Sequence, residues 1–470
     1  MRSGLSCLWR PESSVIHPGI FKSYDIRGIY PTQLDERGAE AIARAFVRVT
    51  GARRVVVGRD VRLSGESLKA AAMAALLRAG VDVVDIGTVS TDMFYFAAAT
   101  LDCDGGFTVS ASHNPRDWNG FNCSRRGAVP MSLDSGLAEM RDLAMQDDGG
   151  APAARPGTLT HQDVWAPFAD YVLGYIDRSL LRPMKIVANG NCGLQVKALR
   201  LVAERGRLPL DIHGIYEEPD GNFPVPGGVP NPLLPQNQGE LVATVTAQKA
   251  DLGVAWDADG DRCFFVDETG YFLSGYFTTA ILARSILTHE PGATVVIDPR
   301  SIWATQETIA ALGGRTVLSR AGMTIIPARM REVNAAFAGE MSAHFYFRRN
   351  WCRDNGMIPL LLMLELLGRE QKPLSALVNP LRARYFASGE INFEVPDAPA
   401  LLQRAAAQFA DGAHDRTDGL SVAYPDWRFN LRSSNTEPLL RLNVEARSQA
   451  ALDQGLARVQ ALIGVPPARH

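Results

Sequence analysis

The sequence lacks paired cysteine motifs and has little net charge. Its six cysteines, at positions 7, 103, 123, 192, 263 and 352, form no C-x-x-C pair. This scatter argues against a disulfide framework or a zinc site and predicts reduced thiols. The formal net charge is only -3 at pH 7 and the pI is about 6.3. Composition therefore gives no reason to expect nucleic acid or an anionic membrane as a partner.

Long hydrophobic runs are also missing. The first fifteen residues mix arginine, proline, glutamate and serine, without the apolar segment of a secretory signal. The longest apolar stretch, Met357 to Leu367, is interrupted by Pro359 and Glu365, and it is shorter than the roughly 20 residues that a membrane helix needs. We therefore expect a cytoplasmic protein with no membrane partner.

The pattern that is present is strand, helix, strand. At 470 residues the chain is too long for one core, and about three or four domains are expected. A β-branched run at Arg54 to Gly58 precedes a helical pattern from Leu68 to Ala79, for which Ser64 is the expected cap, and Val81 to Ile86 is the next strand. This spacing predicts a parallel α/β layer.

Similar units begin at Lys185 and Val295, and a smaller α+β pattern begins near Leu374. Residues 147–158 form a polar linker that contains proline and glycine, and they mark the first domain boundary.

The run from Thr108 to Pro115 is predicted to leave the end of a strand and place Ser112 on an exposed loop, where functional groups of such sheets lie. Ser112 is followed by His113, but the glycines of a nucleophile elbow are absent at Ser110 and Asn114. Acyl-transfer chemistry is therefore disfavoured. A phosphoryl-carrying serine would instead need a metal, cations and protection from water.

Such a metal site is predicted at Asp257, Asp259 and Asp261, which follow a strand at alternate positions. Three carboxylates this close repel one another unless a cation lies between them. An EF-hand is excluded because Arg262 occupies the position that requires glycine and strands flank the loop. Magnesium is favoured over calcium because few carboxylates leave room for a phosphate oxygen.

Two further loops carry polar groups suited to a sugar phosphate: one could read sugar hydroxyl groups and the other could hold a dianionic phosphate. A third segment is a glycine turn before the first strand, which taken alone is typical of a surface loop. The residues are Glu340, Ser342 and His344 in an extended loop, Arg432 to Pro438 before an alternating strand, and Tyr24 with Arg27 at the turn.

These motifs, in this order, closely resemble the α-D-phosphohexomutase family over nearly the whole chain from about Phe21. The strings D-x-D-G-D-R and A-S-H-N-P are jointly very specific. The stretches Arg78 to Thr88, Pro219 to Pro224 with Pro230 to Pro235, and G-E-M-S-A-H resemble the bacterial phosphomannomutase branch, which also includes phosphoglucomutases.

The resemblance implies three similar mixed or parallel α/β sandwich domains and a C-terminal α+β domain around a central cleft. The expected ranges are 1–158 for the phosphoserine domain, 159–255 for the domain with the metal loop at its edge, 256–374 for sugar recognition and 375–470 for phosphate binding. A monomer or weak dimer is expected.

It also implies residue roles. Ser112 would be the phosphorylated serine, with His113 and Arg262 also catalytic. Ser112, Asp257, Asp259 and Asp261 would hold Mg²⁺. Hexose phosphates of mannose and glucose would be the substrates, with a hexose 1,6-bisphosphate phosphorylating Ser112. The implied substrate-binding residues are Tyr24, Arg27, Arg300, Glu340, Ser342, His344, Arg432, Ser434, Asn435 and Thr436.

Two positions depart from the family pattern. Asn122 stands where relatives usually have lysine, and Met323 where they have histidine. We therefore expect a slow or respecialised mutase. The alternatives are a catalytically silent sugar-phosphate-binding homologue and a metal-dependent phosphatase.

Overall fold

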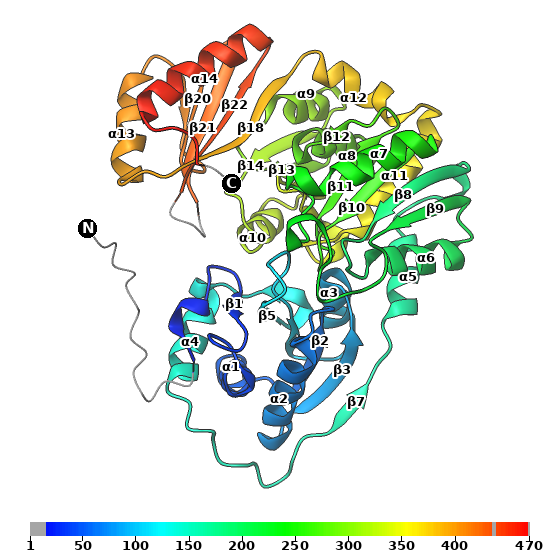
Figure 1. Cartoon of the computed structure of the whole chain (residues 1–470), viewed down its shortest axis with the longest axis vertical. Coiled ribbons are helices and arrows are strands. Elements are labelled where there is room, and N and C mark those ends of the chain that lie inside the picture. Colours follow the sequence, from blue (N-terminus) through cyan, green and yellow to red (C-terminus); the bar gives the residue numbers. More distant parts are fainter. Residues whose placement is uncertain (1–15, 435–438, 469–470) are drawn as a thin grey trace. The chain divides into compact units, whose positions relative to one another are not determined.

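The structure is a computed structural model that describes residues 16–434 and 439–468. The chain divides into two compact units, one ending at residue 164 and the other formed by residues 90–92 together with residue 165 onward. The described residues form four separate sheets, one in the first unit and three in the second (Figure 1).

The first unit contains one mixed sheet in the order β1-β5-β4-β2-β3-β7, with β6 paired to β5. Strands β4, β2, β3 and β7 are parallel, whereas β1, β5 and β6 run antiparallel to their neighbours. The strands are β1 (Ile26–Ile29), β2 (Arg54–Arg59), β3 (Asp82–Thr88), β4 (Gly105–Val109), β5 (Trp118–Arg125), β6 (Val129–Pro130) and β7 (Leu159–His161); the helices in this part of the chain are α1 (Glu36–Thr50), α2 (Gly65–Arg78), α3 (Thr91–Thr100) and α4 (Leu137–Met145).

Local signals explain the helix ends of this unit. Asp35 accepts a hydrogen bond from the Gly38 amide (2.8 Å) and caps α1, which ends at Gly51 with a left-handed φ of 67°. Ser64 is the N-cap residue of α2, as expected, but its side chain makes no cap hydrogen bond to the helix. Its hydroxyl instead accepts a hydrogen bond from the Asn119 amide (2.9 Å), which competes for the oxygen that a cap would use.

The second sheet continues the pattern of a parallel centre with an antiparallel edge, in the order β12-β11-β10-β8-β9. Strands β8, β9 and β10 are parallel, and β10 turns directly into the antiparallel β11. Its elements are β8 (Met184–Asn189), β9 (Leu210–Ile215), β10 (Leu252–Trp256), β11 (Cys263–Asp267) and β12 (Phe272–Leu273), with α5 (Trp165–Leu173), α6 (Gln195–Gly206) and α7 (Gly239–Gln248). This sheet extends beyond residue 255, and the expected domain boundaries stay a prediction.

The third sheet has the order β14-β13-β15-β16-β17, again with three parallel strands and an antiparallel edge. Its strands are β13 (Thr294–Ile297), β14 (Arg315–Leu318), β15 (Phe337–Gly339), β16 (Phe345–Phe347) and β17 (Arg353–Asp354), and the helices of this region are α8 (Gly275–His289), α9 (Trp303–Ala311), α10 (Ile325–Glu332), α11 (Met357–Glu370) and α12 (Leu374–Arg382). Helix α11 is buried along nearly its whole length, which explains its apolar sequence without a membrane.

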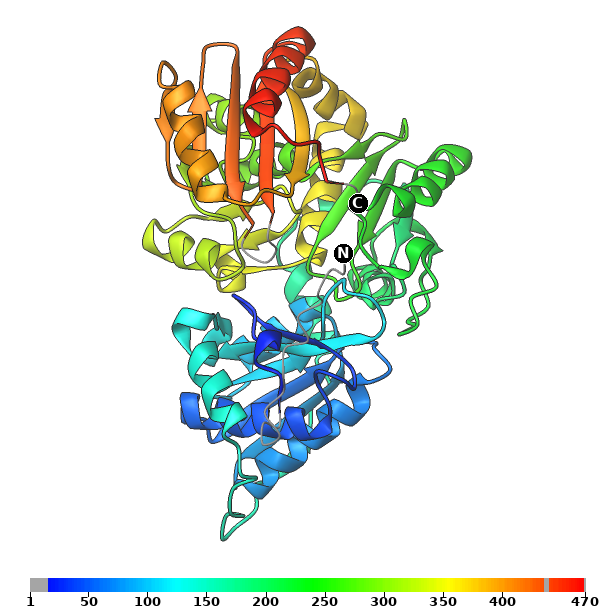
Figure 2. The ribbon, with the colours of Figure 1, turned by 60° about the vertical axis from the view of Figure 1, so that its left-hand side comes forward.

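The fourth sheet is entirely antiparallel, in the order β18-β22-β21-β20-β19. Helices α13 and α14 contact each other and cover the same side of it (Figure 2). Its elements are β18 (Phe386–Phe393), β19 (Ala413–Asp415), β20 (Leu420–Ala423), β21 (Trp427–Ser433) and β22 (Leu440–Ala446), with α13 (Ala398–Gln408) and α14 (Gln449–Ile463). Three similar mixed sheets and one α+β domain confirm the predicted fold class.

Two sequence expectations can be compared with the described residues. All five cysteines within residues 16–434 and 439–468 are free and buried. Over the same residues, no helix combines the length and the apolar character needed to span a bilayer.

Candidate functional site

Ser112 follows β4 in a tight turn of the first unit. Its φ is 48°, a left-handed value that is uncommon for a residue with a Cβ. The backbone amide of Ser112 donates to the Ser110 hydroxyl (3.1 Å), and its own hydroxyl lies 3.1 Å from Nδ1 of His113. The expectation of an exposed serine is wrong, since Ser112 is only 7% exposed.

Arg62 explains how this loop is held, and sequence reasoning missed its role. Its guanidinium is fully buried and donates to four carbonyl oxygens of the loop, those of Ser112, Asn114, Pro115 and Trp118, at 2.6 to 3.0 Å. Asp60 balances the charge at 3.2 Å. The five N–H donors of a guanidinium lie in one rigid plane, so a single arginine can fix a turn that forms no β-ladder hydrogen bonds. The only sequence signal was an arginine just after a strand.

Strand register brings Arg27 to the same loop. Ile26 of β1 and Val109 of β4 both pair with Phe121 of β5, so the start of β1 lies two strands from the end of β4. Arg27 donates to the Asn114 side chain (2.7 Å) and is paired with Asp25 (2.7 Å). Tyr24 lies half-buried in the bend before β1.

The acidic loop joins β10 to β11 in the second unit. Asp257, Asp259 and Asp261 are all buried, and each offers an oxygen within 4.8 Å of the others. Arg262 forms an ion pair with Asp257 at 2.7 Å. The loop requires glycine at Gly260, where φ is 79° and an added Cβ would lie 2.3 Å from the Gln195 side chain.

The electrostatics of this loop fit a bound cation. Burial, followed by repulsion from the neighbouring carboxylates, raises the pKa of Asp259 well above its usual value. The pKa of Asp257 is also raised, first by burial. One oxygen of Asp259 accepts from the Thr91 hydroxyl (2.8 Å), but its other oxygen, Oδ1, is buried without a hydrogen bond. Three hard carboxylate donors, one with an unused buried oxygen, suit a divalent cation such as Mg²⁺.

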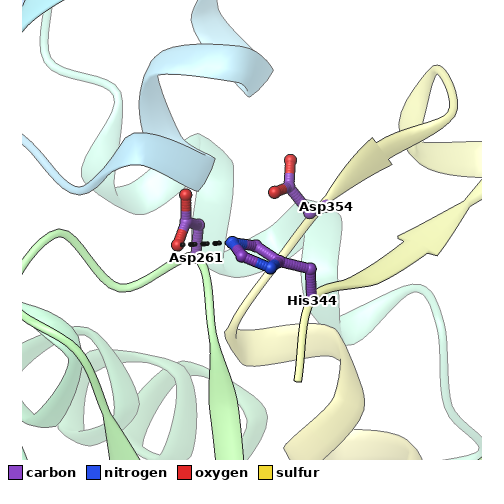
Figure 3. A group of neighbouring side chains, drawn as sticks. All are labelled: Asp261, His344 and Asp354. Carbon is purple, nitrogen blue, oxygen red and sulfur yellow. Dashed lines mark ion pairs between the residues drawn. The ribbon is translucent and has the colours of Figure 1, made fainter. Parts of the chain in front are cut away.

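The predicted sugar loop lies against the acidic loop. Arg262 and His344 form an isolated antiparallel bridge, and the Cys263 amide donates to the Ala343 carbonyl (3.2 Å). His344 Nε2 lies 3.6 Å from Asp261, and Asp354 lies beyond the imidazole (Figure 3). Two predicted loops from different sheets therefore form one cluster.

Glu340, Ser342 and His344 converge, although not for the reason expected from an extended loop. The segment is a turn with Ala343 at a φ of 64°, which corrects that expectation. The turn brings the Ser342 hydroxyl within 3.0 Å of His344 Nδ1, and Glu340 Oε2 lies 3.4 Å from the same nitrogen. Burial opposes the charge on His344, but the carboxylates of Asp261 and Glu340 outweigh it and raise its pKa to about 10.

Parallel strands place Arg300 beside this turn. Ile297 of β13 pairs with Gly339 of β15, so the loops that follow these two strands begin side by side at the same edge of the sheet. Arg300 makes two hydrogen bonds to Asp298, at 2.8 and 2.9 Å, and Asp298 also accepts from the Met341 amide (2.9 Å). Burial tends to raise the pKa of Asp298, but the Arg300 guanidinium outweighs this effect, and the net pKa is lowered.

Arg432 lies at the end of β21 and is 4% exposed. It donates to Glu390 at 3.0 Å. Ser434 is half-buried, and its amide donates to the Leu439 carbonyl (2.8 Å). The predicted phosphate ligands Asn435 and Thr436 lie outside the described residues.

Two residues with no role assigned from sequence line the acidic cluster. Thr91 bonds Asp259 through both its hydroxyl and its amide. Asp354 is fully buried, and this burial raises its pKa to about 7. Neither has a distinctive sequence pattern, because both approach the loop from elements remote in the chain.

The two positions that depart from the family pattern have ordinary contacts. The Asn122 amide donates to the Tyr95 hydroxyl (2.7 Å) within the first unit. The Met323 carbonyl accepts from Arg353 (3.4 Å) within the second.

Comparison with known proteins agrees with this organisation. Four family models match in chain order: phosphoglucomutase/phosphomannomutase α/β/α domain I at residues 18–139, domain II at 166–270, domain III at 274–385 and the C-terminal domain at 390–462. A protein named "Phosphohexose mutases" from Xanthomonas campestris is 44% identical over 92% of this chain and 96% of its own length.

A phosphomannomutase from Salmonella typhimurium is 43% identical over 93% of this chain and 97% of its own. The crystal structure of a phosphoglucomutase/phosphomannomutase family protein from Burkholderia thailandensis has a TM-score of 0.85 and 32% identity, covering 96% of this chain and 99% of that one. The chain therefore belongs to the phosphoglucomutase/phosphomannomutase family and is, like these relatives, an isomerase of the phosphohexose mutase type.

Proposed function

We propose that this enzyme interconverts mannose 6-phosphate and mannose 1-phosphate and also accepts the glucose phosphates. The carrying observation is the cluster in the second unit, where three carboxylates adjoin the Glu340–His344 turn and buried arginines lie nearby. These residues together can bind a sugar that carries a negatively charged group. The identity of more than 40% to proteins named phosphomannomutase supports mannose as the sugar.

Ser112 is proposed as the phosphoryl carrier. Phosphoserine gives its phosphoryl group to a free hydroxyl of the sugar phosphate: the bond between phosphorus and Oγ breaks, a bond to the sugar oxygen forms, and the hydroxyl proton passes to a base. The bisphosphate then turns over, and its other phosphoryl group returns to Ser112. A hexose 1,6-bisphosphate would phosphorylate the resting serine by the same exchange.

In this proposal, further residues carry out proton transfer and bind the sugar and phosphate groups of the substrate. His113, beside Oγ, is the local acid–base candidate. Glu340, Ser342 and His344 would bind sugar hydroxyl groups, and Arg27, Arg300, Arg432 and Ser434 would bind phosphate, with Tyr24, Asn435 and Thr436 in supporting contacts. Positioning and charge neutralisation supply most of the catalysis.

Asp257, Asp259 and Asp261 would hold Mg²⁺, with the Ser112 oxygen as a further ligand during the reaction. When bound, the cation supplies neutralisation of negative charge on the transferring group. Arg262, paired with Asp257, opposes the rise that burial causes in the pKa of that carboxylate and would orient it for the metal.

A coupled assay tests the proposal by comparing kcat/KM for mannose 1-phosphate and glucose 1-phosphate with magnesium present. We expect turnover of both. Intact mass spectrometry after incubation with a hexose 1,6-bisphosphate should show one added phosphoryl group that a Ser112→Ala protein does not acquire. Absence of that group would remove the carrier role, and net release of inorganic phosphate from mannose 6-phosphate would indicate a phosphatase instead.

A further inference from the structure

One carboxylate lies among three arginines in the second unit. Glu390 of β18 accepts from Arg432 of β21 at 3.0 Å through Oε2 and from Arg441 of β22 at 2.9 Å through Oε1. Arg300, which follows β13, lies 3.5 Å from Oε2. Arg300 and Arg432 are buried, and the side chains of Glu390 and Arg441 are about one-fifth exposed.

Strand register explains why an anion is needed there. Arg432 and Arg441 lie directly opposite each other on neighbouring antiparallel strands, a pairing of like charges that is unfavourable by itself. Glu390 pairs with Asn443 of β22 and is therefore a diagonal neighbour of Arg441 on the same strand. From this position it can divide its two oxygens between the two guanidinium groups.

The donors that hold Glu390 are those suited to a phosphate. Guanidinium groups presented to two oxygens of one anion form the charge-assisted geometry by which arginine binds carboxylate and phosphate alike. Arg300 is less available, because two of its donors already bind Asp298. A phosphate bound by Arg432 and Arg441 would therefore have to share or displace the contacts made by Glu390.

We propose that Glu390 is an internal counter-anion that competes with the substrate's phosphate for Arg432 and Arg441 and so sets the affinity of the site. This inference rests on the proposed phosphate-binding role of Arg432. The competition keeps binding moderate, which an enzyme that must release a phosphorylated product requires. The three arginines outweigh burial and lower the pKa of Glu390 to about 2, so its negative charge persists throughout the working pH range.

The test replaces Glu390 with glutamine, which keeps the shape and removes the charge. Binding of inorganic phosphate is measured by calorimetry in a Ser112→Ala background, so that no phosphoserine contributes. We expect Glu390→Gln to lower the Kd roughly tenfold, because the arginines then lack one competing negative charge. Glu390→Asp, which keeps the charge but moves it back from the guanidinium groups, should give a smaller decrease.

Glu307→Gln is the matched control. Glu307 also pairs with two arginines, Arg384 and Arg447, but these do not contact Glu390, and the mutation removes the same charge. Phosphate affinity should be unchanged in this variant. In the Glu390→Gln background, Arg432→Met should abolish the gain, which locates the added affinity at this cluster.

Steady-state kinetics separate this proposal from a merely structural role. With Ser112 intact, Glu390→Gln should lower the KM for hexose phosphate, whereas loss of a scaffold would raise it. Equal or weaker phosphate binding by Glu390→Gln would overturn the inference. A native protein without mutase activity, combined with tighter phosphate binding by Glu390→Gln, would refute the proposed function while leaving the counter-anion in place.

Discussion

Replacing Glu445 is expected to destabilise the joint between the third and fourth sheets. Its fully buried carboxylate accepts from the amides of Ile302 and Trp303, both at 2.9 Å, and from the Tyr276 hydroxyl. These amides lie at the beginning of α9, where a negative charge is favourable. Arg428 lies 3.4 Å away and is also buried.

The magnitude follows from these contacts. Glu445→Gln retains one acceptor oxygen, but it weakens two charge-assisted hydrogen bonds and leaves the Arg428 charge without its carboxylate. Breaking one partner of a buried ion pair costs about 3–5 kcal/mol. Arg428 keeps its hydrogen bonds to the carbonyls of Pro299 and Arg300, which places the expected loss near 3 kcal/mol.

Two measurements check this value. A loss of this size should lower the Tm by roughly 6–10 °C and increase hydrogen exchange at the amides of Ile302 and Trp303. The exposed-pair variant Glu307→Gln should cost less than about 1 kcal/mol. Adding Arg428→Met to Glu445→Gln should recover part of the stability, because the unpaired charge is then absent.

A Tm for Glu445→Gln within 2 °C of the Glu307→Gln control would refute this reasoning. It would mean that the carboxylate is not needed to hold the loop between β13 and α9. Because Arg300 lies in that loop, the destabilised variant should also show a raised KM for hexose phosphate.

The remaining predictions concern the two candidate loops and pH. Arg62→Met removes the donors that hold the carbonyls of the serine turn, so it should lower kcat in an activity assay by at least about tenfold. Metal affinity, measured by calorimetry, should change little, and an unchanged kcat would contradict this prediction. Asp259→Asn should raise the Mg²⁺ concentration needed for half-maximal activity by roughly tenfold or more, and EDTA should abolish turnover; activity insensitive to EDTA would refute the metal role. Asn122→Lys and Met323→His should each raise kcat, by up to about 10²-fold if a proton carrier limits the native enzyme, and no gain from either would show that these positions are not limiting. Folding lowers the pKa of Glu390, so its charge contributes about 2–3 kcal/mol to the free energy of unfolding at pH values above its unfolded pKa near 4.5. This contribution is lost as the pH falls toward 2. The stability of Glu390→Gln should therefore fall less steeply with pH in this window.

Much of the fold followed from local patterns. Alternation of β-branched strands with helical spacing predicted the three α/β units, and the alternation from Leu440 onward predicted β22, although Asn443 and Glu445 on its polar face are buried as well. The motif strings also located the acidic loop, and the turn between β10 and β11 brings its three carboxylates close together.

Local patterns failed where distant residues decide the geometry. Ser112 was expected to be exposed because its neighbours are polar, yet four hydrogen bonds from Arg62 to its loop draw that turn inward. Ser64 occupies the expected N-cap position of α2, but its hydroxyl accepts from Asn119 and makes no cap hydrogen bond. In both cases the competing partner is about fifty residues away along the chain, and no short window of sequence contains it.

The sequence alone determined the family, the order of the four domains and the residue types of the candidate site, because those properties depend on short motifs and their succession. Only the tertiary structure decided which side chains neutralise one another: Glu390 among the arginines, Glu445 at the beginning of α9 and His344 beside Asp261. Charge pairing depends on distances of a few ångströms between elements that are remote in the chain, and strand register and turns set those distances.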